Sequence, residues 1–218
     1  MKKGLVYIGI VSAILLANTS IAQKGTSDTK AQAVINELAI GSPIPNADNV
    51  LHGAIATTKP NKPLTLNNIK TEKGLIVMFS CNTCPFVKKA EVHTKEIMAY
   101  SELQNVGMVL VNSNEATRKD GESEEDMIDF ATHNNYTVPY IVDRGSILAN
   151  AFGATHTPEV FLFDGEGKLV YKGAMEDNPS NPVESVHFYL KEATDAMLAK
   201  GIYQPQVTKS LGCTIKRK

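Results

Sequence analysis

The hydrophobic residues of this chain gather in short continuous runs separated by turn-forming residues. Leu75 to Phe79 is such a run, and its lack of alternation is typical of a strand buried on both faces. The runs 160–163 and 168–171 are joined by Asp164-Gly165-Glu166-Gly167, a sequence that predicts a β-hairpin. Further runs that suit strands occupy residues 106–111 and 138–142, and residues 64–66 form a short edge-strand candidate.

Between these runs, apolar residues recur at helical spacing. Phe86, Ala90, His93 and Ile97 predict a helix that extends to about residue 103. Other helices are predicted from the capping-box pattern at 123–126 through residue 130, over 146–152, and from Asn181, with Pro182 in the first turn, to Gly201. Strands that alternate with helices and then end in a hairpin and a last helix predict an α/β fold whose sheet has an antiparallel edge.

The first residues have the composition of an export signal. Two lysines precede an uncharged apolar stretch over 4–17, and small residues at 20–22 suit a cleavage point. An uncleaved membrane anchor is the alternative, although polar residues at 18–20 interrupt the roughly 20 apolar residues that a span needs. We therefore predict a signal peptide over 1–22, an N-terminal extension over 23–45, one domain with a C-terminal tail over 46–218, and a periplasmic or secreted location.

The overall composition narrows the classes of function. Of the 218 residues, 43% are hydrophobic and 21% are charged, which excludes a wholly disordered or collagen-like chain. The formal net charge is −1 and no long basic tract occurs, so the electrostatics disfavour a nucleic-acid partner. Three cysteines are too few to staple a small secreted scaffold, but export would place them where disulfides persist.

Two of the cysteines form a motif with redox chemistry. Cys81-Asn82-Thr83-Cys84 directly follows the strand at 75–79 and stands where the next helix begins. The free N–H groups of a helix N-terminus stabilise a thiolate, and such settings lower a thiol pKa from about 8.5 to roughly 3.5–7.5. Cys81, at the start of the turn, is therefore predicted to be the attacking thiolate. Cys84 lies close enough to expel a bound partner by forming the intramolecular disulfide.

A zinc site and a purely structural disulfide are the alternatives for this motif. A structural zinc needs four ligands, and the sequence has neither a second Cys-x-x-Cys nor a paired-histidine motif. A disulfide across so short a loop would restrain the unfolded chain very little. The histidines at 52, 93, 133 and 187 are scattered, so no metal and no cofactor is predicted.

Thr157-Pro158 stands immediately before the strand at 160–163. Proline cannot donate to a β-ladder, so it belongs at the beginning of a strand, where a cis bond is most readily accommodated.

Several segments together resemble the thioredoxin-fold thiol–disulfide oxidoreductases of the redoxin (AhpC/TSA and TlpA-like) family, in particular peroxiredoxin-like thioredoxin proteins with a Cys-Asn-x-Cys-Pro active site. These segments are Phe79 to Val87, Gly153 to Asp164, residues 165–173 and the ending Gly212-Cys213-Thr214-Ile215-Lys216. The resemblance spans roughly residues 40–218. It implies a mixed central sheet flanked by helices, with a redoxin-type β/α insertion at 138–153. It also implies that Cys81 is the nucleophile, Cys84 the resolving cysteine and Pro158 a cis-proline that faces the dithiol.

The chain also departs from thioredoxin in ways that bear on the chemistry. Asn82-Thr83 stand where thioredoxin has Gly-Pro, so the direction of electron flow does not transfer. The strand at 75–79 contains no acid, so the proton acceptor must be water or another group such as Glu176. Many relatives have a cysteine at the position of His156, whose imidazole either tunes the dithiol or lies on the surface.

These observations predict an exported oxidoreductase that exchanges disulfides with the thiols and disulfides of protein partners. The alternatives are a metal-binding or chaperone module that uses the dithiol and His156, and a peroxidase. A peroxidase is disfavoured because the peroxiredoxin motif Pro-x-x-x-Thr/Ser-x-x-Cys is incomplete before Cys81: Gly74 and Met78 stand at its Pro and Thr positions.

Cys213 lies in the terminal segment 210–218 between apolar Leu211 and Ile215. A leftover cysteine in an exported protein is a free thiol, an intermolecular link or a partner to an internal thiol. Because Cys81 and Cys84 are expected to pair with each other, Cys213 is predicted to stay reduced. It would then pack the tail on the domain, outside the catalytic cycle.

Overall fold

The computed structural model describes residues 37–55 and 64–218 together with Met1. Apart from Met1, the signal peptide predicted over 1–22 lies outside these residues, as does most of the extension predicted over 23–45. Within the described ranges, no helix is long and apolar enough to cross a membrane.

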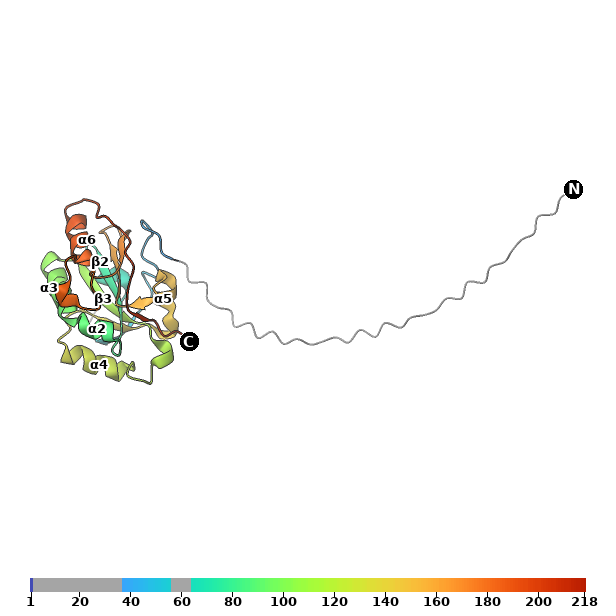
Figure 1. Ribbon diagram of the computed structural model, residues 1–218, viewed down its shortest axis with the longest axis horizontal. Coiled ribbons are helices and arrows are strands. Elements are labelled where there is room, and N and C mark those ends of the chain that lie inside the picture. Colours follow the sequence, from blue (N-terminus) through green and yellow to red (C-terminus); the bar gives the residue numbers. More distant parts are fainter. Residues whose placement is uncertain (2–36, 56–63) are drawn as a thin grey trace. The chain divides into compact units, whose positions relative to one another are not determined.

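A mixed sheet of six strands, in the order β1-β4-β3-β2-β6-β7, forms the centre of the molecule (Figure 1). Its strands are β1 (His52–Ile55), β2 (Leu75–Ser80), β3 (Gly107–Asn112), β4 (Tyr140–Val142), β6 (Glu159–Phe163) and β7 (Leu169–Gly173). The neighbours β2, β3 and β4 run parallel, whereas β1, β6 and β7 pair antiparallel with their neighbours. The predicted α/β class with an antiparallel edge is therefore confirmed.

Helices cover both faces of this sheet. They are α1 (Leu66–Ile69), α2 (Pro85–Lys89), α3 (Glu91–Gln104), α4 (Glu124–His133), α5 (Ile147–Phe152) and α6 (Tyr189–Leu198). In Figure 1, α3 and α6 lie on one side of the sheet and α5 lies on the other.

The central strand β2 supplies both hydrophobic cores because successive side chains point to opposite faces. Ile76 and Met78 pack with buried residues of α3, α4 and α6 on one side. Leu75, Val77 and Phe79 pack with buried residues of α1 and α5 on the other. All residues of β2 are buried, which explains why the run carries no polar alternation.

Turn and cap residues decide where several elements begin and end. The capping box predicted at Ser123 is present, with Asp126 as its partner, and Gly153 ends α5 in the left-handed conformation at φ +70°. The predicted strand at 64–66 is wrong, because Thr65 instead caps α1 by accepting a hydrogen bond from Asn68 N–H at 3.0 Å. The single helix predicted from Phe86 is divided into α2 and α3, which meet at Ala90.

The last helix begins later than the sequence predicts. Asn181 and Pro182 open only a 3₁₀ turn over Pro182–Glu184, and α6 starts at Tyr189. Val186, which lies within the predicted helix, is 76% exposed. The buried face starts at Leu190, so hydrophobic burial rather than the Asn-Pro signal sets the start of this helix.

Part of the predicted N-terminal extension packs on the sheet. Gly41 N–H donates to the Leu169 carbonyl at 2.8 Å, and Ile44 is buried in the core beside α1. Gly41 and Ile44 therefore belong to the packed body.

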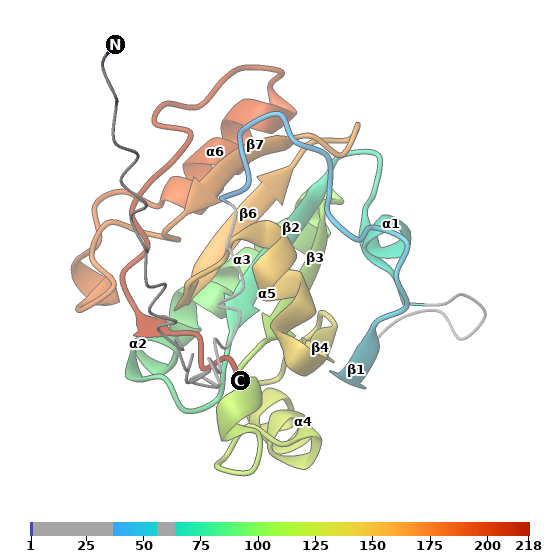
Figure 2. The ribbon, with the colours of Figure 1, turned by 90° about the vertical axis from the view of Figure 1, so that its right-hand side faces the viewer.

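The C-terminal tail returns to the sheet as a second, two-stranded ladder. Strand β8 (Cys213–Thr214) pairs antiparallel with β5 (His156–Thr157), which directly precedes Pro158 and β6. Figure 2 shows this red segment beside the start of α2. The tail therefore lies next to the two cysteines that follow β2.

Candidate active site

The Cys81–Cys84 turn joins the end of β2 to the start of α2. Both cysteines are free thiols, and their side chains are buried, with 0% and 2% of their surface exposed. They form a small cluster with Val87, against which Phe86, Phe130 and Cys213 pack. The close pairing predicted from the Cys-x-x-Cys spacing is thus present in the folded chain.

Thr157 links this dithiol to the proline predicted to face it. Its hydroxyl Oγ1 lies 3.2 Å from Cys81 Sγ, and its carbonyl accepts a hydrogen bond from the Cys84 thiol at 3.3 Å. The Thr157–Pro158 peptide bond is cis, as the resemblance implies. Glu159 holds the preceding loop by accepting hydrogen bonds from the backbone of Thr155 and His156 at 2.7 and 2.9 Å. The structure therefore brings Cys81, Cys84 and the peptide bond of Pro158 together.

The two thiols shift each other's pKa in opposite directions. The pKa of Cys84 is lowered, first because the Cys81 thiol donates a hydrogen bond to its sulfur. Burial raises this pKa and so opposes the shift. The Cys213 thiol and the backbone N–H groups of Val87 and Cys213 lower it further. The pKa of Cys81 is raised because its proton bridges to Cys84, because it is buried, and because the charge of Glu122 repels a thiolate. The directions of these two shifts favour one thiolate for the pair, held on Cys84.

The role of Cys81 as the attacking thiolate stays a prediction, and the direction of the Cys84 pKa shift favours Cys84 instead. That prediction assumes that the helix opens at Cys81, but the first helical residue is Pro85 and Cys84 is the N-cap. The backbone N–H of Val87, in the first turn of α2, therefore serves Cys84. The Thr157 carbonyl acts in the opposite direction, because it accepts a hydrogen bond from the Cys84 thiol and so favours its protonated form.

Glu122 is the residue of this site that the sequence gives no means of finding. Its carboxylate is fully buried and accepts four hydrogen bonds, from the backbone N–H groups of Asn82 and Thr83 at 3.0 Å each and from the Thr83 hydroxyl and the Asn112 amide at 2.6 Å each. It thus holds the two middle residues of the motif from 39–40 positions away in the sequence. No motif or spacing marks a lone acid at that distance.

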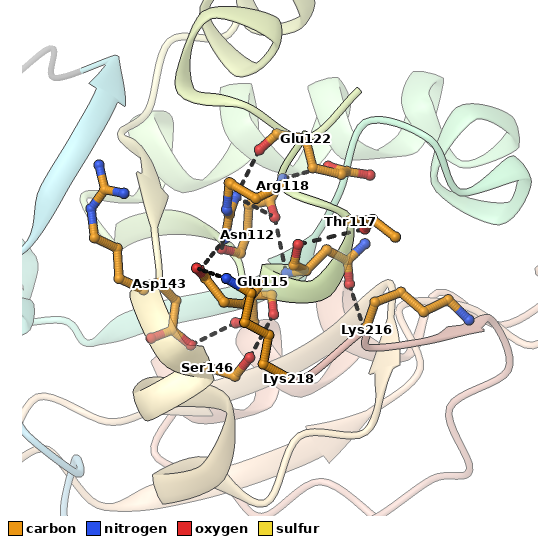
Figure 3. Close-up of polar contacts among 12 residues, drawn as sticks. Asn112, Glu115, Thr117, Arg118, Glu122, Asp143, Ser146, Lys216 and Lys218 are labelled. Carbon is orange, nitrogen blue, oxygen red and sulfur yellow. Dashed lines mark hydrogen bonds and ion pairs between the residues drawn. The ribbon is translucent and has the colours of Figure 1, made fainter. Parts of the chain in front are cut away.

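A polar network supports Glu122 from the carboxyl end of β3. Asn112 accepts a hydrogen bond from Arg118 at 3.0 Å, and Arg118 also donates to the backbone carbonyl of Glu122 at 2.8 Å (Figure 3). The Tyr140 hydroxyl donates to Asn82 at 2.9 Å. These bonds pair the carboxylate of Glu122 and the amides of Asn82 and Asn112 with buried partners, and they keep the backbone of the motif in one conformation.

Two further residues that the sequence singles out lie apart from the sulfurs. His156 bonds to the Thr155 hydroxyl through Nδ1 at 2.8 Å, and it alternates in β5 with Thr157, the residue that faces the dithiol. Glu176 bonds to His93 and to Ser185, and burial raises its pKa. Neither residue contacts Cys81 or Cys84. In the part of the chain that the structure describes, no cluster of three His, Cys, Asp or Glu side chains has the arrangement of a metal site.

Comparison with known proteins agrees with this geometry. The family model described as Redoxin matches residues 39–188. The chain belongs to the redoxin family. Comparison with curated proteins gave no match. Family membership together with the buried dithiol supports a thiol oxidoreductase.

Solved structures show the same fold for this redoxin. An uncharacterized conserved protein from Geobacillus kaustophilus has 29% sequence identity and a TM-score of 0.73, over 84% of this chain and 94% of that chain. A hypothetical protein from Sinorhizobium meliloti 1021 has 30% identity and a TM-score of 0.71, over 84% and 97% of the two chains. A thioredoxin-like protein, solved in its oxidized form, has 20% identity and a TM-score of 0.58, over 75% and 99%. The thioredoxin-like fold that the resemblance implies is therefore confirmed.

Proposed function

We propose that this redoxin is an exported thiol–disulfide oxidoreductase that exchanges disulfides with protein partners through Cys81 and Cys84. The observation that carries the proposal is the pair of buried, adjacent thiols beside the cis Thr157–Pro158 bond. A hydrogen bond from the Cys81 thiol lowers the pKa of Cys84 and so favours its thiolate. Thiolates are the nucleophiles of disulfide exchange, so a stabilised thiolate next to a second thiol is the arrangement that this chemistry needs.

The reaction follows from the two thiols alone. The Cys84 thiolate attacks one sulfur of a partner disulfide, which forms a mixed disulfide and releases the other partner sulfur as a thiolate. Cys81 then loses its proton and attacks the Cys84 sulfur, which releases the second partner sulfur. The partner gains two electrons and two protons, and the chain retains the Cys81–Cys84 disulfide. The same steps in reverse oxidise a partner dithiol.

Reduction of insulin by dithiothreitol tests this proposal. The wild-type chain should accelerate the precipitation of insulin, whereas Cys81→Ser/Cys84→Ser should give the uncatalysed rate. His133→Ala is a control, because His133 is an exposed residue at the end of α4, remote from the motif in sequence. If the wild-type chain and the double variant reduce insulin at the same rate, the proposed activity is wrong.

A further inference from the structure

The C-terminal tail lies against β5, the strand whose residue Thr157 contacts the dithiol. In the β5–β8 ladder, Cys213 stands opposite Thr157, whose hydroxyl and carbonyl contact the two sulfurs of the motif. Gly212 makes this approach sterically feasible: a Cβ atom at that position would lie 2.2 Å from the Thr157 carbonyl oxygen. The backbone of the tail therefore lies so close to β5 that only glycine fits at position 212.

Contacts beyond β8 fix the tail in one register. Ile215 is 3% exposed in the core beside α5, and its N–H donates to the Thr155 carbonyl at 2.9 Å. The backbone of Lys216 makes two hydrogen bonds with the segment after β3: its N–H donates to the side-chain Oδ1 of Asn114 at 2.9 Å, and its carbonyl accepts from Ala116 N–H at 2.8 Å. Figure 3 shows Lys216 and Lys218 against this loop. The segment that carries Cys213 is thus a fixed part of the fold.

The Cys213 side chain packs against the cluster formed by Cys81, Cys84 and Val87. The Cys213 thiol donates to the Cys84 sulfur, and its backbone N–H also stabilises the Cys84 thiolate. Burial raises the pKa of Cys213 to about 11, and the hydrogen bond and charge of Cys84 add to that effect. Cys84 therefore has two thiols as neighbours, Cys81 from its own turn and Cys213 from the tail.

We propose that Cys213 is a third redox-active thiol, which resolves mixed disulfides on Cys84 in parallel with Cys81. This proposal rests on the proposed function, because a partner disulfide supplies the oxidising equivalents. When a partner sulfur is bonded to Cys84, the Cys213 sulfur attacks Cys84. The Cys84–Cys213 bond forms, the Cys84–partner bond breaks, and the partner leaves as a thiol that carries the proton lost by Cys213.

The resulting Cys84–Cys213 disulfide is in equilibrium with the Cys81–Cys84 disulfide. Attack of Cys81 on the Cys84 sulfur releases Cys213 and transfers its proton, with no net change in oxidation state. The prediction that Cys213 packs the tail on the domain is borne out by the β5–β8 ladder. The proposal departs from the prediction that Cys213 stays outside the catalytic cycle, because the fold packs its side chain against the cluster that contains Cys84.

Single-turnover reaction with glutathione disulfide tests the proposal. Acid quenching followed by intact-mass measurement compares three reduced variants: Cys81→Ser, Cys81→Ser/Cys213→Ser and Cys81→Ser/Thr214→Ala. The last is the matched control, because Thr214 is the exposed neighbour of Cys213 in β8. In Cys81→Ser and in the control, the glutathione adduct on Cys84 should convert to an internal disulfide. Without Cys213 the adduct should persist about tenfold longer or more, since an adjacent thiol acts at a high effective concentration. The internal disulfide should link tryptic peptides 74–88 and 210–216.

The variant Cys84→Ser tests which sulfur Cys213 reaches. Its glutathione adduct on Cys81 should persist as long as that of Cys81→Ser/Cys213→Ser, because the tail presents Cys213 to Cys84. Equal adduct lifetimes in Cys81→Ser and Cys81→Ser/Cys213→Ser would overturn the role of Cys213. Equally fast conversion in Cys84→Ser would overturn its assignment to Cys84. Neither result bears on the proposed function, which fails only if the wild-type chain does not accelerate the reduction of insulin disulfides.

Discussion

Replacing Glu122 by Gln should strongly destabilise the active-site turn without changing its size. Each carboxylate oxygen of Glu122 accepts two hydrogen bonds, and both oxygens lie in a fully buried side chain. Gln presents an NH₂ group in place of one oxygen, so two buried donors lose their acceptor and face another donor. An unsatisfied buried donor costs about 1–3 kcal/mol, so the free energy of unfolding should fall by about 2–6 kcal/mol, less the relief from burying a neutral group.

Guanidinium denaturation of the reduced protein measures this loss, with Glu124→Gln as the matched control. Glu124 is 45% exposed and pairs with Arg144 on the surface, so its substitution should change stability by less than about 1 kcal/mol. Glu122→Gln should also lower the pKa of Cys81, because the charge that repels its thiolate is removed. Equal unfolding midpoints for the two variants would show that Glu122 does not hold the Cys81–Cys84 turn.

Four further predictions follow from the same contacts. Reduced protein should show ultraviolet thiolate absorbance at pH 7, where an ordinary thiol of pKa about 8.5 is mostly protonated; Cys84→Ser should remove this signal and Cys81→Ser should keep it. The reduction potential should lie above the value of about −270 mV for thioredoxin, because a stabilised thiolate favours the reduced form, and equilibration with glutathione measures it. Burial raises the pKa of Glu91 to about 7, so between the ordinary carboxyl pKa and 7 the native state binds one proton more than the unfolded state. The free energy of unfolding should therefore fall as the pH rises through that window. Urea titrations should show a smaller fall for Glu91→Gln. Gly212→Ala should detach β8, seen as faster hydrogen exchange across 213–216, because the new methyl would overlap the Thr157 carbonyl.

Local signals predicted the elements whose own residues determine them. The apolar run at 75–79 is a buried strand, because a segment apolar on both faces has no other stable place than the middle of a layered fold. Ser123 caps α4, since the capping box needs only residues of its own turn. The start of α6 did not follow its local Asn-Pro signal, because burial of Leu190 against the sheet contributes more than a cap.

The dithiol was predictable from its spacing, whereas its electrostatics were decided by the tertiary structure. The Cys-x-x-Cys spacing together with the preceding strand indicates two adjacent thiols at a strand–helix junction. Which thiol holds the negative charge depends on groups that are remote in sequence: the buried Glu122 beside Cys81 and the tail residue Cys213 beside Cys84. The free energy of a thiolate is set by the charges and hydrogen-bond donors within a few ångströms. Those neighbours are assembled only when β3, β5 and β8 converge on the end of β2, so no local pattern of residues could reveal them.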